Sequence, residues 1–569
     1  MSNLDWAVLA ATLLLIVSYG VYKSRNSKNI EDYLLGNRSL PWYHVCLSVM
    51  ATQASAITFL SAPGLAYTTG MSFVQFYLGL PFAMIVLSIT FVPIFHQLKV
   101  FTAYEYLEQR FDFKTRALTA FLFLIQRGIS TGITIYAPSI ILATILNIDT
   151  NYTTFFIGSL VIIYTVYGGT KAVSYTQVLQ MSVIFFGLLF AGIMVVHLMP
   201  ANIGLSKALH IAGKAGRTNA IDFKFDWNNQ YNVWSGLIGG FFLQLSYFGT
   251  DQSQVGRYLT GSSVTQSRLG LIMNGFVKIP MQFLILLIGV LVFAFYQYNQ
   301  PPIFFNKYEI TRLENSPYKS EFQQLKQEYT KIFEEKKIAV ESLADHLDSD
   351  ETAVTFDRQQ LKTADEKLKA VKQKVTALMT KNNPDAEIND NNYIFLSFVT
   401  KYLPHGLVGL LIAIIFLASM GSTASALNSL TSTTVVDIYK RLLNKNASEK
   451  SYLAASRWIT VGWGAFCMFT AFFASKLGNL IEAVNILGSL FYGTILGIFI
   501  VAFYLKRIGA KAIFPAALIT EAVVFTVWKL NFMAFLWLNV LGCLLVVIVS
   551  WLIENLFLSQ IKKSDQYPG

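Results

Sequence analysis

The chain has 569 residues, of which 54% are hydrophobic and 14% charged, and its formal net charge is +11. A soluble core of this length does not need so much apolar surface, so the composition predicts an integral membrane protein. The apolar residues come in runs of roughly 20 to 28 without strand-like alternation, which favours membrane helices and excludes a transmembrane β-barrel. The basic residues lie mostly in short loops beside these runs, a pattern of membrane topology that excludes a nucleic-acid patch.

Hydropathy predicts about 13 membrane helices. In chain order they are expected near residues 4–23, 42–68, 71–96, 116–146, 153–168, 174–199, 233–256, 268–298, 405–438, 452–475, 478–505, 510–530 and 532–557. The odd total predicts that the two termini face opposite sides. Lys and Arg clusters fall in alternate loops, so the positive-inside rule predicts an outside N-terminus and a cytoplasmic C-terminus, in a plasma membrane or a bacterial inner membrane.

Residues 299–403 interrupt this pattern with a polar segment of mixed charge. Its stretches Ser320–His346 and Gln359–Thr380 have helical apolar spacing, which predicts an external helical hairpin. Mixed charge favours a solvated spacer or a packing cap over the alternative, a module that contacts another protein.

The second predicted helix is rich in small and polar residues from Met50 to Gly64 and ends in Pro63 and Gly64. A continuous helix is not expected there, because broken helices are tolerated at mid-membrane only where they line a cavity. The carbonyl groups that such a break frees can replace the water shell of a hard cation.

The ninth predicted helix carries Ser422, Ser425 and Ser429 at helical spacing, which places three hydroxyl groups on one side. Small and hydroxyl residues are also common between packed membrane helices, and composition alone favours that structural explanation. Two such helices in one chain shift the balance toward an ion site.

Several motifs together resemble the sodium/solute symporter family. They are Asp32–Trp42, Thr102–Phe111, Tyr167–Val173, Gln252–Leu259, Ala424–Ser429 and Val436–Tyr439, in this order. The resemblance implies two inverted repeats of five helices, here the second to sixth and the seventh to eleventh, with a broken first core helix and extra helices at both ends. It divides the chain into an N-terminal helix (1–30), the first repeat and the start of the second (31–298), the external insert (299–403), the rest of the second repeat (404–505), and C-terminal helices with a short tail (506–569).

The resemblance also implies a sodium site between the first and eighth core helices, which are the second and ninth predicted helices of this chain. Its ligands would be the backbone carbonyls of Ala51 and Ala54, together with Ala418 and Ser422. Two positions depart from the family pattern: Gly421 stands where a second hydroxyl is common, and Gln177 stands where many relatives carry an Asp on the sodium exit route. Both departures predict altered coupling.

The substrate pocket is expected beside the sodium site, near the middle of the membrane. The residues that the family pattern places there are Gln53, Thr58, Gln75, Tyr77, Gln244, Tyr247, Lys278 and Glu482. Lys278 lies well inside the eighth helix, where a charge costs about 2.5 to 3.5 kcal/mol unless it is paired or wetted. The alternatives are a lysine that braces the bundle by pairing with Glu482 or one that extends to a membrane face, and Arg127 poses the same question.

A sodium-coupled importer of a small organic solute is therefore expected, with Na⁺ as coupling ion, the lipid bilayer as surroundings, and no cofactor or transition metal. The run Gly132–Ser139 resembles the branch that carries monocarboxylates, vitamins and iodide, while Lys278 resembles the sugar carriers; Tyr77, where those have an acid, weighs against a sugar. A sodium-independent facilitator or channel is the rival class, although no repeated filter loop supports it. No kinase or hydrolase motif is present, so no enzyme is expected.

Overall fold

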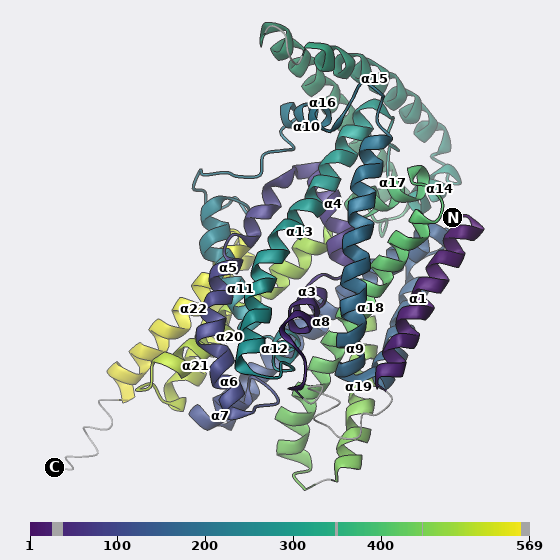
Figure 1. The fold of residues 1–569 in the computed structure, drawn as a ribbon. Helices are drawn as coiled ribbons and strands as arrows, with labels where there is room; N and C mark the ends of the chain where they lie inside the picture. The colour runs from purple at the N-terminus through teal and green to yellow at the C-terminus, as the bar shows by residue number, and fades with distance from the viewer. Residues whose placement is uncertain (25–37, 347–350, 447, 559–569) are drawn as a thin grey trace, which may run out of the picture.

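The computed structural model describes residues 1–24, 38–346, 351–446 and 448–558, and in these ranges the chain is built from helices (Figure 1). The one strand-like pairing within them is an isolated parallel bridge between Leu40 and Gly261. The predicted all-α class is thus confirmed. Most of the Asp32–Trp42 motif lies outside the described residues.

Every predicted membrane helix overlaps one or more observed helices. These are α1 (Asn3–Ser24), α3 (Trp42–Gln53), α4 (Ala56–Thr69), η2 (Met71–Tyr77), α5 (Leu80–Ile89), α6 (Phe91–Leu98), α8 (Phe113–Leu146), α9 (Thr150–His197), η3 (Ser235–Gly239), α11 (Gly240–Thr250), α12 (Gln252–Tyr258), α13 (Val264–Tyr298), α18 (Leu407–Thr433), η5 (Thr434–Leu443), α19 (Glu449–Ala471), η6 (Ala474–Leu477), α20 (Leu480–Tyr504), α21 (Ala510–Lys529), α22 (Phe535–Leu552) and η7 (Ile553–Leu558). Among the described residues, eight helices are long and apolar enough to cross a membrane, or nine if the bent pair α3 and α4 forms one span. The total of about 13 stays a prediction.

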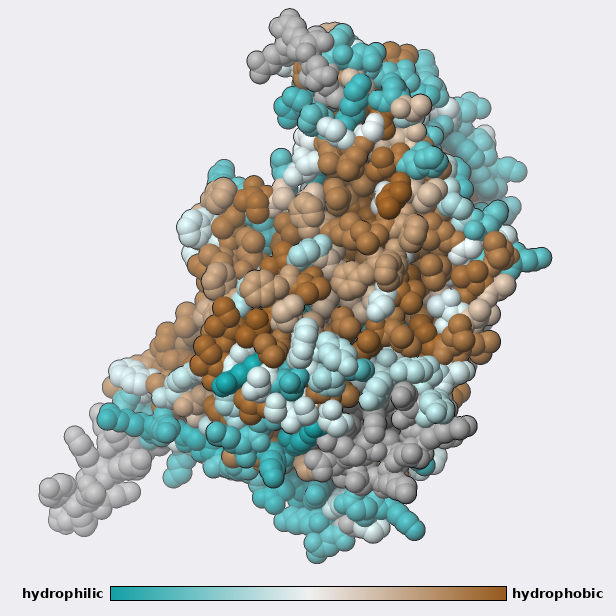
Figure 2. Space-filling model, in the orientation of Figure 1, coloured by the Kyte–Doolittle hydropathy of each residue, from teal (hydrophilic) through white to brown (hydrophobic). Residues whose placement is uncertain are grey.

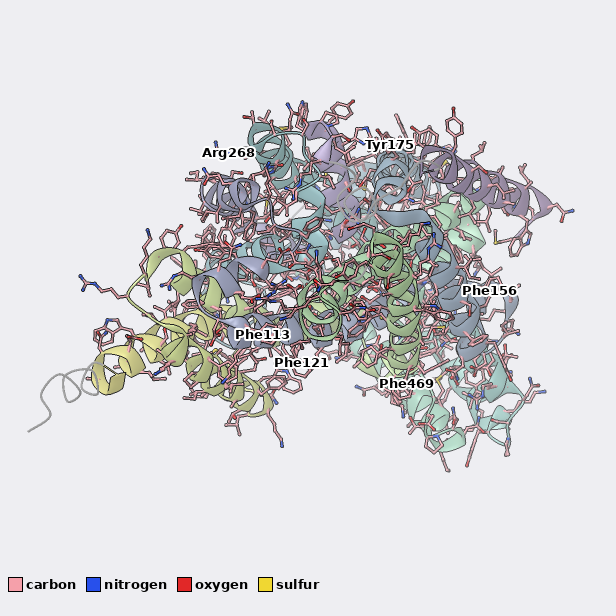
Figure 3. The ribbon with its side chains drawn as sticks, turned by 90° about the horizontal axis from the view of Figure 1, so that it is seen from below. Phe113, Phe121, Phe156, Tyr175, Arg268 and Phe469 are labelled. Carbon is pink, nitrogen blue, oxygen red and sulfur yellow. The ribbon has the colours of Figure 1, made fainter. Side chains whose placement is uncertain are left out.

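The surface shows where a bilayer would surround the molecule. A wide apolar band lies between a polar upper end and a polar lower end (Figure 2). Phe121, Phe156 and Phe469 are more than half exposed and lie at the periphery of the bundle seen from below (Figure 3). Aromatic side chains exposed on the sides of a helical bundle are suited to contact with lipid.

The first core helix is broken within the Met50–Gly64 stretch, as the sequence predicts. Helices α3 and α4 meet at 61°, and Ala54 and Ser55 between them leave the helical conformation. Pro63 lies inside α4 without ending it. Gly64 instead permits a close approach, because a Cβ atom there would lie 2.0 Å from the carbonyl oxygen of Asn391.

A second break interrupts the seventh predicted helix, where Asp251 has an extended backbone between α11 and α12. Its side chain caps α12 by accepting from the backbone N–H of Ser253 at 2.8 Å. Each of the two implied repeats therefore begins with an interrupted helix, the arrangement expected of an inverted-repeat transporter.

The fifth and sixth predicted helices form one element, α9, with apolar halves Thr150–Val166 and Val173–His197. The hydroxyl oxygens of Tyr164 and Thr176 lie 3.4 Å apart. A straight helix would separate residues twelve positions apart by about 18 Å along its axis. The chain therefore bends sharply between the two halves.

Two family-like motifs are joined at the lower end of the bundle. Asp437, in η5, accepts from the hydroxyl of Thr102 at 2.9 Å and from the guanidinium Nε of Arg116 at 2.7 Å. The same guanidinium donates to Glu108, in α7 (Glu105–Arg110), at 2.7 Å. These charged groups tie the end of α18 and η5 to α7 and α8, and so fix one wall of the bundle.

The insert forms a cap at the upper end in Figure 1. It contains α14 (Lys307–Glu314), α15 (Lys319–His346), α16 (Glu351–Asn382), η4 (Asn391–Tyr393) and α17 (Ile394–Tyr402), and α10 (Leu205–Lys214) lies beneath it. The two stretches expected as a hairpin fall in α15 and α16, which pack against each other. They share a small apolar core that includes Phe304, Phe322 and Val375.

Candidate functional site

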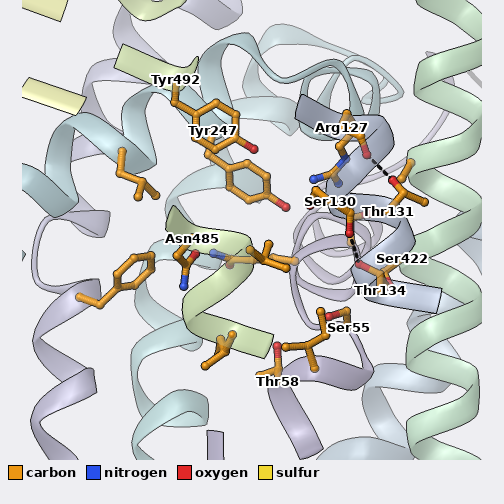
Figure 4. A pocket seen from close by; sticks show the side chains of 18 of the residues that line it. Ser55, Thr58, Arg127, Ser130, Thr131, Thr134, Tyr247, Ser422, Asn485 and Tyr492 are labelled. Carbon is orange, nitrogen blue, oxygen red and sulfur yellow. Dashed lines mark hydrogen bonds between the residues drawn. The ribbon is translucent and has the colours of Figure 1, made fainter. Parts of the chain in front are cut away.

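A polar cavity lies in the middle of the bundle, between α4, α8, α11, α18 and α20 (Figure 4). The empty space within it, together with the open solvent at its mouth, amounts to about 760 Å³. Its lining residues are Thr52, Gln53, Ser55, Ile57, Thr58, Phe76, Tyr77, Arg127, Ser130, Thr131, Thr134, Leu243, Tyr247, Ser422, Ala426, Ile481, Val484, Asn485 and Tyr492. None of these described lining residues is acidic.

Arg127 supplies the one charged side chain among those described lining residues. Its guanidinium lies 3.6 Å from the carboxylate of Asp251 and 5.8 Å from the centre of the Tyr247 ring. Asp251 also accepts from the hydroxyl of Tyr492 at 2.9 Å, so the break in the seventh helix supplies the counter-charge. The Nε atom of Arg127 is buried without a hydrogen-bond partner. The arginine is thus held in place while one donor is left unused.

The two aromatic residues above the cavity form a small assembly. The rings of Tyr247 and Tyr492 have centroids 5.8 Å apart, and Figure 4 shows them on the side of the cavity where Arg127 lies. The Tyr247 hydroxyl accepts from the side-chain amide of Gln254 at 2.6 Å. This network orients Tyr247, one of the residues that the family pattern places in the substrate pocket.

The break between α3 and α4 frees backbone carbonyls for a cation. The N–H of Ser55 donates to Gln53 at 3.1 Å instead of continuing the helix, so the carbonyl of Ala51 loses its usual helical partner. Ala54 lies at the break itself. Such carbonyls suit a hard cation such as sodium.

Ser422 brings a hydroxyl oxygen to the same region. It lines the cavity together with Thr52, Gln53 and Ser55 of the broken segment, while α18 packs against both α3 and α4. Ala418 lies one turn earlier in α18 and is buried. The residues predicted for sodium therefore belong to two helices that pack together at the cavity, and their donor set fits Na⁺.

Lys278 lies behind the cavity wall rather than in it. Its side chain is fully buried in α13, and its Nζ atom has no hydrogen-bond partner. The nearest described aromatic group is Tyr77, whose ring centre lies 5.9 Å from Nζ. Tyr77 lines the cavity and Lys278 does not, so the amine lies close to the cavity wall without being part of it.

The other predicted pocket residues divide into two groups. Gln53, Thr58 and Tyr247 line the cavity with Tyr77, whereas Gln75, Gln244 and Glu482 do not. Gln75 is bound to the backbone of Tyr231 at 2.9 Å, and the Tyr231 hydroxyl donates to Glu482 at 3.1 Å. Glu482 is thus engaged with Tyr231, and no ion pair joins it to Lys278 among the described residues.

Sequence reasoning missed much of the wall that α8 and α20 provide. Ser130 and Thr131, one turn after Arg127, and Thr134, two turns after it, form a polar stripe, and Asn485 faces the cavity from α20. Helical spacing of hydroxyl residues was the available signal in α8, as it was in α18. Asn485 carries no such pattern.

Two interrupted helices around a polar cavity in a membrane bundle define a secondary transporter. The chain belongs to the sodium:solute symporter family, whose model matches residues 33–310 and 375–520. It is accordingly a membrane transporter and not an enzyme, and the activity is sodium-coupled symport of a solute.

Relatives with known names carry different solutes. The chain is 27% identical to sodium-coupled monocarboxylate transporter 1 of Mus musculus, covering 87% of this chain and 68% of the relative. It is 25% identical to the sodium/sialic acid symporter NanT of Aliivibrio fischeri, covering 99% and 95%. A solved structure of a Na⁺-coupled sialic acid symporter, in a substrate-bound outward-open state, superposes with a TM-score of 0.75 at 23% identity over 98% of each chain. This last similarity supports the fold.

Proposed function

We propose that the chain imports a small organic anion, a monocarboxylate or a vitamin-like acid, together with sodium. The observation that carries this proposal is the free donor on the cavity wall: Arg127 is the one charged residue among the described lining residues, Asp251 holds its guanidinium from outside that lining at 3.6 Å, and its Nε atom has no hydrogen-bond partner. An arginine keeps its charge in proteins and can form paired hydrogen bonds with a carboxylate. The buried amine of Lys278, 5.9 Å from the centre of the Tyr77 ring, adds a second donor close to this wall.

In this proposal, coupling arises because the sodium site fills before the solute cavity. Sodium bound between Ala51, Ala54, Ala418 and Ser422 would hold α18 against the broken segment and so complete the cavity wall. Solute bound to that wall would then favour closure of the outer side and opening toward the cytoplasm. The N-terminus is proposed to lie outside and the C-terminus inside a plasma or bacterial inner membrane, by the positive-inside rule.

A sugar is the second candidate, because Gln53, Thr58 and Asn485 offer amide and hydroxyl groups and two tyrosine rings lie near them. Two of the relatives are named for acids, a monocarboxylate and sialic acid, and the second of these is an acidic sugar. An acidic sugar would satisfy both the arginine and the hydroxyl groups.

The test is a thermal-shift screen of detergent-purified protein against monocarboxylates, vitamins, neutral sugars, acidic sugars and halides, each in sodium and in potassium. A bound ligand stabilises the folded state by mass action. Stabilisation by an organic acid that requires sodium is expected. A response to neutral sugars alone would overturn the anion assignment, and identical shifts in sodium and potassium would indicate a facilitator.

A further inference from the structure

The two departures from the family pattern, Gly421 and Gln177, lie against each other. The side-chain Nε2 of Gln177, in the second half of α9, lies 3.4 Å from the carbonyl oxygen of Gly421 in α18. A Cβ atom on Gly421 would lie 2.7 Å from the side-chain oxygen of Gln180, one turn further along α9. A serine at position 421 would therefore displace Gln180, so these positions form one packed unit.

The amide of Gln177 is surrounded by oxygen atoms from α3 and α18. Its Nε2 donates to the hydroxyls of Thr52 at 3.3 Å and Ser425 at 3.1 Å, and its Oε1 accepts from the hydroxyl of Ser48 at 2.6 Å. All four of these side chains are almost completely buried. Thr52 also lines the cavity, so the cluster adjoins the sodium site around Ser422.

Such a group of oxygens is chemically suited to a cation, but here the two N–H groups of an amide face it. A hard cation needs several oxygen lone pairs directed at it, and the lone pairs of Thr52, Ser425 and Gly421 face N–H donors instead. Displacing the amide would leave a buried donor unpaired, which is unfavourable. The amide therefore occupies the place that a second ion would need.

We infer that Gln177 is a positioning residue that keeps this cluster free of ions, so that the chain binds one sodium ion per transport cycle, at Ser422. This inference rests on the sodium coupling proposed above. With one sodium, uptake of a singly charged anion moves no net charge, and a tenfold sodium gradient supports about tenfold accumulation.

The test measures how many sodium ions the purified full-length protein binds, using radioactive sodium at equilibrium. The expected result is one ion for the wild type and two for Gln177→Asp, because a carboxylate accepts only and would turn the same hydroxyls into ligands. Gln180→Asp is the matched control: it adds the same charge one turn away and is expected to keep one ion. Two ions in the wild type, or one in Gln177→Asp, would overturn the inference.

Two further results separate this inference from the proposed function. No sodium bound by the wild type would refute sodium coupling itself, whereas two ions would leave coupling intact and refute only the role of Gln177. Gln177→Leu provides a second variant if the aspartate variant does not stay monodisperse. One ion in that variant would support the part of the inference that places the single ion at Ser422 and not on the amide, and none would overturn it, because the amide would then belong to the sodium site.

Discussion

Ser422 places a hydroxyl group where α18 meets the broken first core helix. It shares the cavity wall with Thr52 and Ser55, and the freed carbonyl of Ala51 belongs to the same break. Sodium affinity should therefore depend on this one side chain more than on the other serines of α18.

Ser422→Ala is expected to raise the sodium concentration for half-maximal uptake about tenfold, which corresponds to about 1.4 kcal/mol for one lost oxygen ligand. The measurement is uptake against sodium concentration at fixed solute. Ser429→Ala is the matched control, because the Ser429 hydroxyl donates to the carbonyl of Ala426 at 2.7 Å and does not line the cavity. Equal sodium dependence in the wild type and Ser422→Ala would remove Ser422 from the site.

Lys278→Met should lower solute uptake without lowering the stability of the fold. The buried amine has no partner, and replacing an unsatisfied polar group by an apolar one of similar shape should leave stability unchanged or raise it by about 1 kcal/mol. Uptake of an organic acid should nevertheless fall at least about tenfold, the equivalent of about 1.4 kcal/mol, because the amine lies 5.9 Å from the ring centre of Tyr77, which lines the cavity. Thermal unfolding and uptake are measured on the same preparation. Normal uptake by a stable variant would make the lysine purely structural.

At the scale of elements, the cap is fastened to the helices that line the site. Gly64 of α4 lies against the backbone of Asn391, and the side chain of Asn392 donates to the carbonyl of Gly478, just before α20. The start of the cap's last segment therefore holds α4 near α20. A movement of α4 during transport should therefore also displace η4.

Gly64→Ala is expected to lower thermal stability, by about 1 to 3 kcal/mol, because the added methyl group meets backbone that cannot rotate away. Gly462→Ala is the control: a Cβ atom at that position in α19 has no heavy atom within 4 Å. That second change should be neutral or slightly stabilising, since alanine favours a helix. Equal stability of both variants would contradict this prediction and would mean that η4 can move away from α4 at little cost in free energy.

The cap also contains a partly buried acid, Glu387, outside the membrane-spanning helices. The pKa of Glu387 is raised from 4.5 to about 7, chiefly by burial and also by the nearby carboxylates of Glu309 and Asp390, although hydrogen bonds from Tyr393 at 2.5 Å and Tyr136 at 3.2 Å oppose the shift. Between these two pKa values the folded state binds more protons than the unfolded state. The contribution of Glu387 to stability is therefore complete below about pH 4.5 and is lost as the pH rises to about 7.

Thermal stability should accordingly fall between pH 5 and pH 7.5 by up to about 3 kcal/mol, and Glu387→Gln should remove this part of the dependence. Unfolding is measured at several pH values for both proteins. Glu341→Gln, at an exposed position on α15, is the control and should keep the pH dependence of the wild type. If the stability of Glu387→Gln depended on pH as strongly as that of the wild type, the effect would belong to another titrating group.

At the scale of the whole molecule, the orientation in the membrane can be tested with single cysteines. The three native cysteines, Cys46, Cys467 and Cys543, are all buried. Glu328 on the cap and Lys445 at the opposite end are exposed. We expect Glu328→Cys to react with a membrane-impermeant maleimide on intact cells and Lys445→Cys to react only after permeabilisation, which is a difference of about tenfold or more in labelling. The reverse result would invert the topology.

The sequence by itself determined the features that depend on local chemistry. The long apolar runs require a bilayer, the Met50–Gly64 segment cannot form an uninterrupted membrane helix, and the serines of α18 share one side because of helical spacing. The position of the break was not predictable from Pro63, because a proline that packs well inside a helix need not end it.

Tertiary structure alone decided which distant side chains meet. Arg127 pairs with Asp251 at the break between α11 and α12, Lys278 lies near the ring of Tyr77 and forms no ion pair with Glu482, and Gln177 contacts Gly421 across a sequence separation of 244 residues. The physical reason is that each helix fixes only its own spacing. The rotation and depth of one helix against another follow from side-chain packing over the whole bundle, and a polar group's partner is settled only when that packing is complete.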